Sequence, residues 1–171
     1  KTPLIFYSDP DQWEPKDFWL LYGKIKDYDL IVGRKRKRAD PWHRKFIGWG
    51  HATLVKIMFN LPIFDIDSGF KLIKREVLHS VLPEIHTLKD GFQTELTIRA
   101  YYKGYKVAEV PVTHKLRPSG TGTTRTFFFS KLPKVIARQF FNLLKLRREL
   151  KQIACVCFNL FVIHFIFSFD C

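Results

Sequence analysis

Two aspartates separated by one proline, and a glutamine directly after them, form the first group of oxygen-bearing side chains in the chain. Asp9, Asp11 and Gln12 come just after the apolar run "PLIFY". Two carboxylates at positions i and i+2 of a turn can hold a hard divalent cation such as Mg²⁺ or Mn²⁺, which commonly completes its shell with diphosphate oxygens. A turn that caps the following helix explains the same residues, and the pattern alone favours that turn.

Basic side chains follow the predicted strands in a way that suits a phosphate site. Arg34 follows the second strand, Arg44 lies ten residues later, and Arg117 follows the last strand. A guanidinium group forks onto phosphate oxygens, so these arginines favour a substrate with several of them. We assign Lys35 and Lys37 to a solvated basic surface.

Composition sets the class of protein and leaves its partner open. The chain has 171 residues, of which 46% are apolar and 26% charged, as expected for one globular domain. Its net charge of +13 attracts nucleic acid, phosphorylated metabolites or anionic lipid. The three cysteines, Cys155, Cys157 and Cys171, show no metal-site spacing, and we expect a reducing compartment.

The pattern of strands and helices is that of an α/β fold. Strands are predicted over 3–7, 28–33 and 105–117, and helices over 15–26, 46–59 and 90–104. Residues 65–82 pass from a turn through a short strand into a helix. Open α/β sheets bind their ligands at the carboxyl ends of strands, which is where the aspartates and arginines lie.

The C-terminal part is basic and amphipathic, and then apolar. Residues 131–151 predict a helix that either lies in a membrane interface or packs on the domain's own core. In the first case Phe140, Phe141, Leu143 and Leu144 would face the lipid. The last nineteen residues are either a membrane segment or a buried one, and if they insert, the preceding basic residues would stay cytoplasmic.

Four segments together resemble a known family, the GT-A fold glycosyltransferases of family 2, and within it the polyprenyl-phosphate sugar transferases of the dolichol-phosphate mannose synthase type. The segments are "SDPDQWEP", "YDLIVGRKRKR", "FDIDSGFKLIKREVL" and "GFQTELTIRAYYKGYKVAEVPVTHKLRPSGTGTT". They occur in the family's order over roughly Leu4 to Thr124, which is far more specific than any one of them.

The resemblance implies a partial GT-A (Rossmann-like) α/β domain over 1–125. After this domain the sequence pattern places the basic amphipathic helix over 126–152 and the apolar tail over 153–171, each with the two interpretations given above. The family opens with a strand, a P-x-[YF]-N-E turn and a helix that cradle the nucleotide base, and no such segment precedes Lys1. We therefore expect the chain to carry the metal and acceptor half of the domain.

The resemblance also implies roles for single residues. Asp9, Asp11 and Gln12 would hold Mg²⁺ or Mn²⁺, although the family usually has one more residue before the glutamine. Arg34, Arg44 and Arg117 would bind substrate phosphate, and Arg117 would come from a loop that closes over the site.

Acidic residues further along the chain have competing interpretations. Asp65 would orient the acceptor phosphate, or it forms a turn with Asp67 before Gly69. Glu95 is read as an acceptor-side acid or as an ion-pair partner for Arg99 at i+4, and the pair is favoured. Glu109 is expected to hold the "RPSG" loop.

The implied activity is a metal-dependent transfer of a sugar from a nucleotide-diphosphate donor to a polyprenyl (dolichyl or undecaprenyl) phosphate. It would take place in a membrane-associated protein whose catalytic domain is cytoplasmic. A transferase that acts on a hydroxyl acceptor is an alternative, and it would need a general base. A nucleic-acid-binding module would explain the charge but not the ordered motifs.

Overall fold

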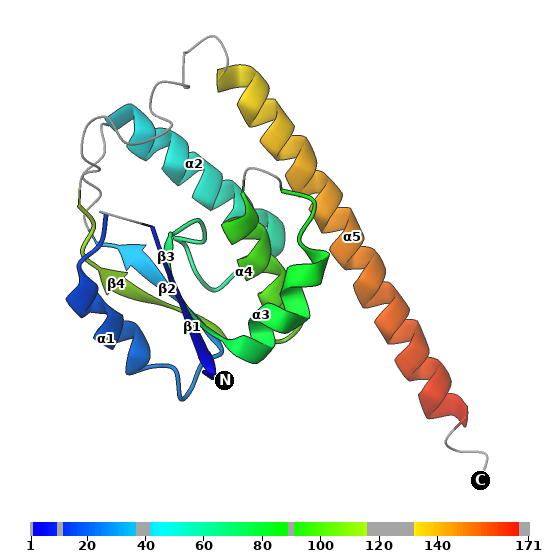
Figure 1. The fold of residues 1–171 in the computed structure, drawn as a ribbon. Helices are drawn as coiled ribbons and strands as arrows, with labels where there is room; N and C mark the ends of the chain where they lie inside the picture. The colour runs from blue at the N-terminus through cyan, green and yellow to red at the C-terminus, as the bar shows by residue number, and fades with distance from the viewer. Residues whose placement is uncertain (1, 10–11, 37–41, 89–90, 116–131, 168–171) are drawn as a thin grey trace.

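Four short strands form a mixed sheet at the centre of the fold (Figure 1). The computed structural model describes residues 2–9, 12–36, 42–88, 91–115 and 132–167. The strands β1 (Leu4–Ser8), β2 (Leu30–Lys35), β3 (Phe70–Lys74) and β4 (Val107–Val112) lie in the order β1-β3-β2-β4. The helices are η1 (Pro15–Asp17), α1 (Phe18–Tyr22), α2 (Trp42–Phe59), α3 (Arg75–Val81), η2 (Leu82–Glu84), α4 (Phe92–Tyr102) and α5 (Leu132–Phe167). The prediction of a mixed α/β fold is confirmed.

Strand β3 runs against its neighbours. It pairs antiparallel with both β1 and β2, whereas β2 and β4 are parallel. Ser8 at the end of β1 is opposite Phe70 at the start of β3, and Lys35 at the end of β2 is opposite Val112 at the end of β4. The carboxyl ends of β1, β2 and β4 therefore meet at the edge of the sheet where β3 begins.

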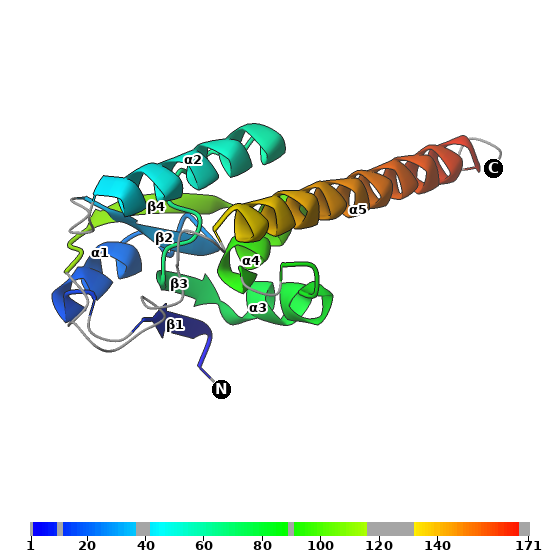
Figure 2. The ribbon, with the colours of Figure 1, turned by 90° about the horizontal axis from the view of Figure 1, so that it is seen from above.

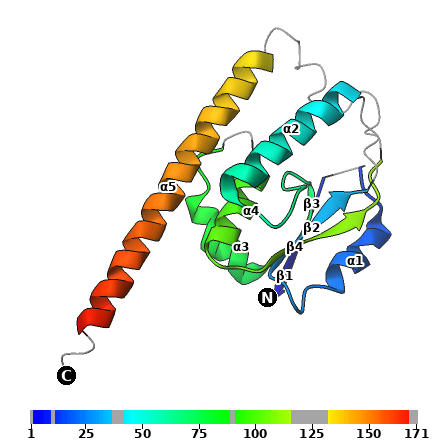
Figure 3. The same ribbon diagram turned by 180° about the vertical axis from the view of Figure 1, so that it is seen from behind.

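Alternating side chains along the strands bury both faces of this sheet, because successive strand residues point to opposite faces. Ile31, Leu72 and Val110 pack in one cluster with Leu21 of α1. The other cluster joins β2 and β3 to α2, α3, α4 and α5. Figures 1 and 3 show the result, with α1 on one side of the sheet and α2 on the other.

Several element boundaries differ from prediction. Strand β4 ends at Val112, although a strand was predicted to reach residue 117, and α1 ends at Tyr22, although a helix was predicted to reach residue 26. Tertiary packing explains two further differences. Strand β2 continues through Gly33, which was expected to end it. A Cβ at Gly33 would lie 2.8 Å from side-chain carbons of Phe70 and Val112, so glycine serves close packing here. Helix α2 begins at Trp42, four residues before the predicted start, and runs through Gly48 and Gly50, because Val55 and Phe59 anchor its far end in the core.

Helix α5 is continuous from Leu132 to Phe167 and extends past the rest of the domain (Figure 2). Leu143, Leu146 and Leu150 are buried against the core. The expectation that Leu143 and Leu144 face lipid is therefore wrong, because both pack on the protein, whereas Phe141 is 67% exposed. Among the residues that the structure describes, no helix is both long and apolar enough to cross a bilayer.

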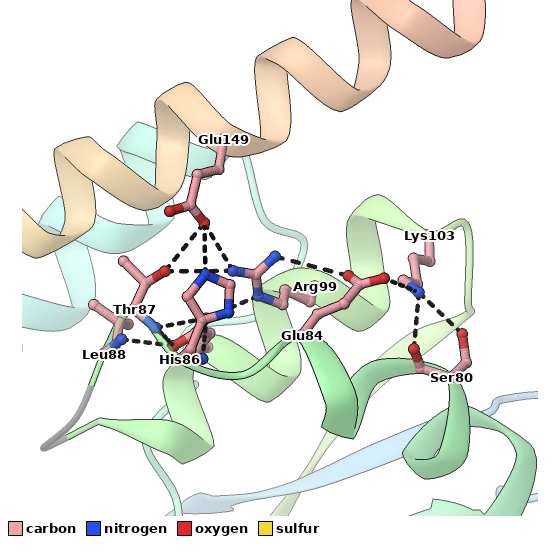
Figure 4. A network of polar contacts seen from close by, with 9 residues as sticks. Ser80, Glu84, His86, Thr87, Leu88, Arg99, Lys103 and Glu149 are labelled. Carbon is pink, nitrogen blue, oxygen red and sulfur yellow. Dashed lines mark hydrogen bonds and ion pairs between the residues drawn. The ribbon is translucent and has the colours of Figure 1, made fainter.

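Buried charges fix α5 to the domain (Figure 4). Glu95 of α4 is fully buried and accepts hydrogen bonds from the backbone N–H groups of residues 86–88 and, at 2.8 Å, from Arg99 Nε. Arg99 Nη2 in turn donates to Glu149 of α5 at 2.9 Å. The interpretation of Glu95 as an ion-pair partner of Arg99 is confirmed, and α5 is part of the same network.

Removal of the arginine from this network should strongly destabilise the protein. We expect Arg99→Met to lower the free energy of unfolding by about 3–5 kcal/mol, because it leaves the buried Glu95 carboxylate without its cation. Urea denaturation measures the change. The matched control is Arg75→Met, which removes surface contacts to Thr2 and should change stability by no more than about 1 kcal/mol. Equal losses in the two variants would contradict this account.

The same network makes stability depend on pH. Burial alone raises the pKa of Glu95, but the N–H donors of Leu88, Arg99, Thr87 and His86 outweigh it, and the net pKa is lowered. The stability that Glu95 contributes is thus present above its unfolded pKa and is lost as pH falls through the folded value. We expect the stability difference between wild type and Glu95→Gln to shrink below about pH 4. Urea midpoints from pH 7 to 3, with the exposed Glu76→Gln as control, test this.

Candidate active site

The edge where β3 begins gathers acidic and basic side chains from all four strands and their loops. Asp9 follows β1, Arg34 and Lys35 end β2, and Asp65 and Asp67 precede β3. Glu109, in the middle of β4, reaches the same loop through hydrogen bonds. These residues are far apart in sequence. They meet here because β1, β2 and β4 end at the edge of the sheet where β3 begins.

Asp9 sits directly on Gly69. Its backbone N–H donates to the Gly69 carbonyl at 2.8 Å, and a Cβ built on Gly69 would overlap the Asp9 carboxylate. Glycine is therefore required at this position by close approach. Tyr7 Oη donates to Asp9 Oδ1 at 3.0 Å, and Gln93 Nε2 donates to Tyr7 Oη at 2.9 Å. Burial and then the Asp9 charge raise the pKa of Tyr7, which keeps the phenol protonated.

Asp65 ties its loop to the end of β2. One carboxylate oxygen accepts the backbone N–H of Lys35 at 2.9 Å, and the other accepts Lys35 Nζ at 3.2 Å. The assignment of Lys35 to a solvated surface is thus wrong, because its side chain is only 12% exposed and its Nζ lies 5.8 Å from the Trp13 ring centroid. Lys37 is outside the described residues.

Glu109 holds the loop from the other side. Its Oε2 accepts the backbone N–H of Phe64 at 2.8 Å and that of Asp65 at 3.2 Å, and its Oε1 accepts Arg34 Nη1 at 3.1 Å. The sequence indicated a loop-holding role but pointed to the "RPSG" loop, which lies outside the described residues. The Arg34 side chain stays 55% exposed and can meet an anion while it keeps this contact.

Lys71 is a buried cation that the sequence analysis missed. Its side chain lies on the same face of β3 as Ile73, which packs in the cluster with α2 and α4. It is fully buried and donates from Nζ to the Ile66 carbonyl at 2.7 Å. Burial lowers the pKa of Lys71 to about 8, and the charges of Asp67 and Asp65 oppose that shift. The sequence feature that could have indicated this burial is the place of Lys71 between Phe70 and Leu72 in an otherwise apolar strand.

A cavity of about 170 Å³ lies between these charges and α2. Arg34, Lys35, Asp65 and Asp67 form its polar side. Gly48, His51 and Ala52 line it from α2, at spacings of three and four residues that share one helix face. A second cavity of about 240 Å³ is lined by Arg34, Lys35, Arg36, Glu109 and Pro111. The end of β2 thus separates two polar hollows that share Arg34 and Lys35.

The other predicted site residues are placed only in part. Asp11 and Arg117 lie outside the described residues. Arg44 lies in α2, but its side chain is outside the described part. The Gln12 carbonyl accepts the backbone N–H of Lys115 at 2.8 Å. Within the described ranges no group of three or more His, Cys, Asp or Glu side chains forms a metal site, so the metal ligands stay a prediction.

No family model matches the chain. Undecaprenyl-phosphate mannosyltransferase of Micrococcus luteus is 28% identical over 113 residues, which cover 63% of this chain and 46% of that protein. Polyprenol monophosphomannose synthase of Mycolicibacterium smegmatis is 33% identical over 98 residues, or 54% of this chain and 37% of that protein. Dolichyl-phosphate hexose transferase of Haloferax volcanii is 28% identical over 124 residues, which cover 70% of this chain and 53% of that protein.

The chain therefore spans about half the length, or less, of these curated relatives. All three are sugar transferases whose names specify a polyprenyl-type lipid. The resemblance to polyprenyl-phosphate sugar transferases, inferred from four segments of the sequence, is confirmed.

Proposed function

We propose that the protein containing this chain transfers a sugar from a nucleotide-diphosphate donor to a polyprenyl phosphate at the cytoplasmic face of a membrane. The chain supplies part of a GT-A catalytic domain. The observation that carries the proposal is the convergence of the Asp9 carboxylate and a cavity lined by Arg34 and Lys35 at one edge of the sheet. The similarity to polyprenyl-phosphate sugar transferases supports the choice of substrates.

A divalent cation fits the first part of this edge. Asp9, Asp11 and Gln12 offer carboxylate and amide oxygens, the ligands that Mg²⁺ and Mn²⁺ prefer. The close contact between Asp9 and Gly69 restricts where one of these carboxylates can lie. Bound there, the cation would neutralise charge on the diphosphate of the departing nucleotide.

The second part of the edge suits an acceptor phosphate. The exposed Arg34 guanidinium can fork onto phosphate oxygens, and Arg44 and Arg117 would add further guanidinium groups. A lipid phosphate is already an anionic nucleophile at neutral pH, so attack on the anomeric carbon needs no general base.

Asp65 fits the role of a positioning residue. Both of its oxygens accept hydrogen bonds from Lys35, and its backbone N–H is held by Glu109. A carboxylate that is engaged in this way is poorly placed to remove a proton. This observation favours a phosphate acceptor over a hydroxyl acceptor.

Exposed apolar side chains of α2 support contact with a membrane surface. Phe46, Trp49 and Ile57 of α2 are 68%, 56% and 75% exposed. At 100° per residue they share one helix face, opposite the face of Val55 and Met58 that packs on the core. An exposed apolar helix face of this kind suits the interface of a bilayer.

Loss of the metal or of Asp9 should abolish sugar transfer. We expect EDTA, Asp9→Asn and Gly69→Ala each to reduce transfer by at least about 100-fold in the full-length protein, because the diphosphate charge is no longer neutralised. Transfer of labelled sugar from a panel of nucleotide sugars to polyprenyl phosphate measures this. The exposed Asp27→Asn is the matched control. Full activity in EDTA would refute metal dependence, and loss of turnover in Asp65→Asn at unchanged binding would favour a hydroxyl acceptor.

Membrane contact should depend on the exposed face of α2. We expect Trp49→Ser to weaken partition onto vesicles of mixed neutral and anionic lipid by about tenfold, because one aromatic side chain loses its apolar contact. Cosedimentation with vesicles measures the partition. Trp19→Ser removes a tryptophan that is at least as exposed, at 67%, from α1 on the opposite side of the sheet, and it should have no effect. Equal losses in both variants would contradict this surface.

A further inference from the structure

We propose that Tyr7 and Gln93 are positioning residues that orient the Asp9 carboxylate toward a divalent cation. The inference rests on the proposed function, in which Asp9 is a metal ligand. The structure links the three side chains by two hydrogen bonds, from Gln93 Nε2 to Tyr7 Oη at 2.9 Å and from Tyr7 Oη to Asp9 Oδ1 at 3.0 Å.

Asp9 is held at three points. Its backbone N–H is bonded to the Gly69 carbonyl, its carboxylate rests where a Gly69 Cβ would be, and Tyr7 binds Oδ1. The backbone bond fixes where the side chain starts, and the contact with Gly69 limits its rotation. Tyr7 then selects which oxygen points back into the protein.

Tyr7 is itself held in place by two residues of α4. Its ring meets the Phe92 ring edge to face, with centroids 5.9 Å apart, and its hydroxyl receives the Gln93 amide. Both partners lie in the first turn of α4, where the next residue, Thr94, donates to Asp67 at 3.2 Å. One turn of one helix thus sets the position of two carboxylates at the site.

The direction of the hydrogen bonds follows from the chemistry of the donors. An amide NH₂ group only donates, so Tyr7 accepts from Gln93 and its single proton is directed to Asp9. If the Gln93 amide were reversed, its oxygen would take that proton and the hydroxyl lone pairs would face a carboxylate. In the structure the hydroxyl proton of Tyr7 is therefore directed at Asp9 Oδ1.

A neutral donor also leaves the carboxylate available to a cation. A carboxylate has about four acceptor positions, and the Tyr7 hydroxyl uses one of them. A lysine or arginine in place of Tyr7 would add a positive charge and compete with the metal. Side chains that orient metal ligands in this way commonly change metal affinity by about 10–100-fold when they are removed.

The test is Mn²⁺ binding by the full chain, measured from the electron paramagnetic resonance signal of free Mn²⁺. We expect Tyr7→Phe, which keeps the ring and its contact with Phe92, to raise the Kd about 10–100-fold. Gln93→Met should raise it less, and the double variant should be no weaker than Tyr7→Phe, because both act through one hydroxyl. Tyr22→Phe, the same change at an exposed tyrosine of α1, should leave the Kd unchanged.

Three outcomes separate the possibilities. A raised Kd in Tyr7→Phe at an unchanged melting temperature supports the inference, since a purely structural role would not move metal affinity alone. An unchanged Kd in Tyr7→Phe, when Asp9→Asn abolishes binding, overturns the inference and leaves the proposed metal site intact. Absence of any Mn²⁺ binding that depends on Asp9 overturns both. If Tyr7→Phe folds poorly, Gln93→Met decides the question by itself.

Discussion

The reversed direction of β3 is the constraint on which the site depends. Because β3 runs against β1 and β2, and β2 is parallel to β4, three strands end at the edge where β3 begins. The side chains that follow those strands and the loop that precedes β3 share this edge. Four strands in a single direction would have placed the 64–69 loop at the opposite end of the sheet, away from Asp9.

Half-buried charges hold this edge together, and two carboxylates are matched by partners from other elements. Asp65 is paired with Lys35 of β2, and Glu109 of β4 binds both the loop and Arg34. Removal of a single partner from such a network leaves an uncompensated charge, which costs more free energy than the pair contributes. The contacts of Asp65 and Glu109 therefore favour one conformation of the loop that precedes β3.

The sequence predicted most strands and helices and the places of Asp9 and Arg34 after strands, because apolar runs and periodicity report local structure. The role of Asp65 came from the family resemblance. It did not predict the burial of Lys35 and Lys71. Burial of a lysine depends on carboxylates and carbonyls contributed by distant segments, such as Asp65 and Ile66, and no local pattern records them. For the same reason Glu109 was recognised as a loop-holding residue, but the loop that it binds was not. The roles of the proposed metal ligands remain predictions.

The contact between Asp9 and Gly69 has a consequence for the evolution of related sequences. The carboxylate occupies the space where every other amino acid carries a Cβ, so the aspartate can be kept in this place only where the glycine is kept. A relative in which the glycine has been replaced must have moved or lost its aspartate, and the two positions should vary as a pair across an alignment. Loss of the glycine is then a mark, readable from sequence alone, of which descendants have given up this arrangement.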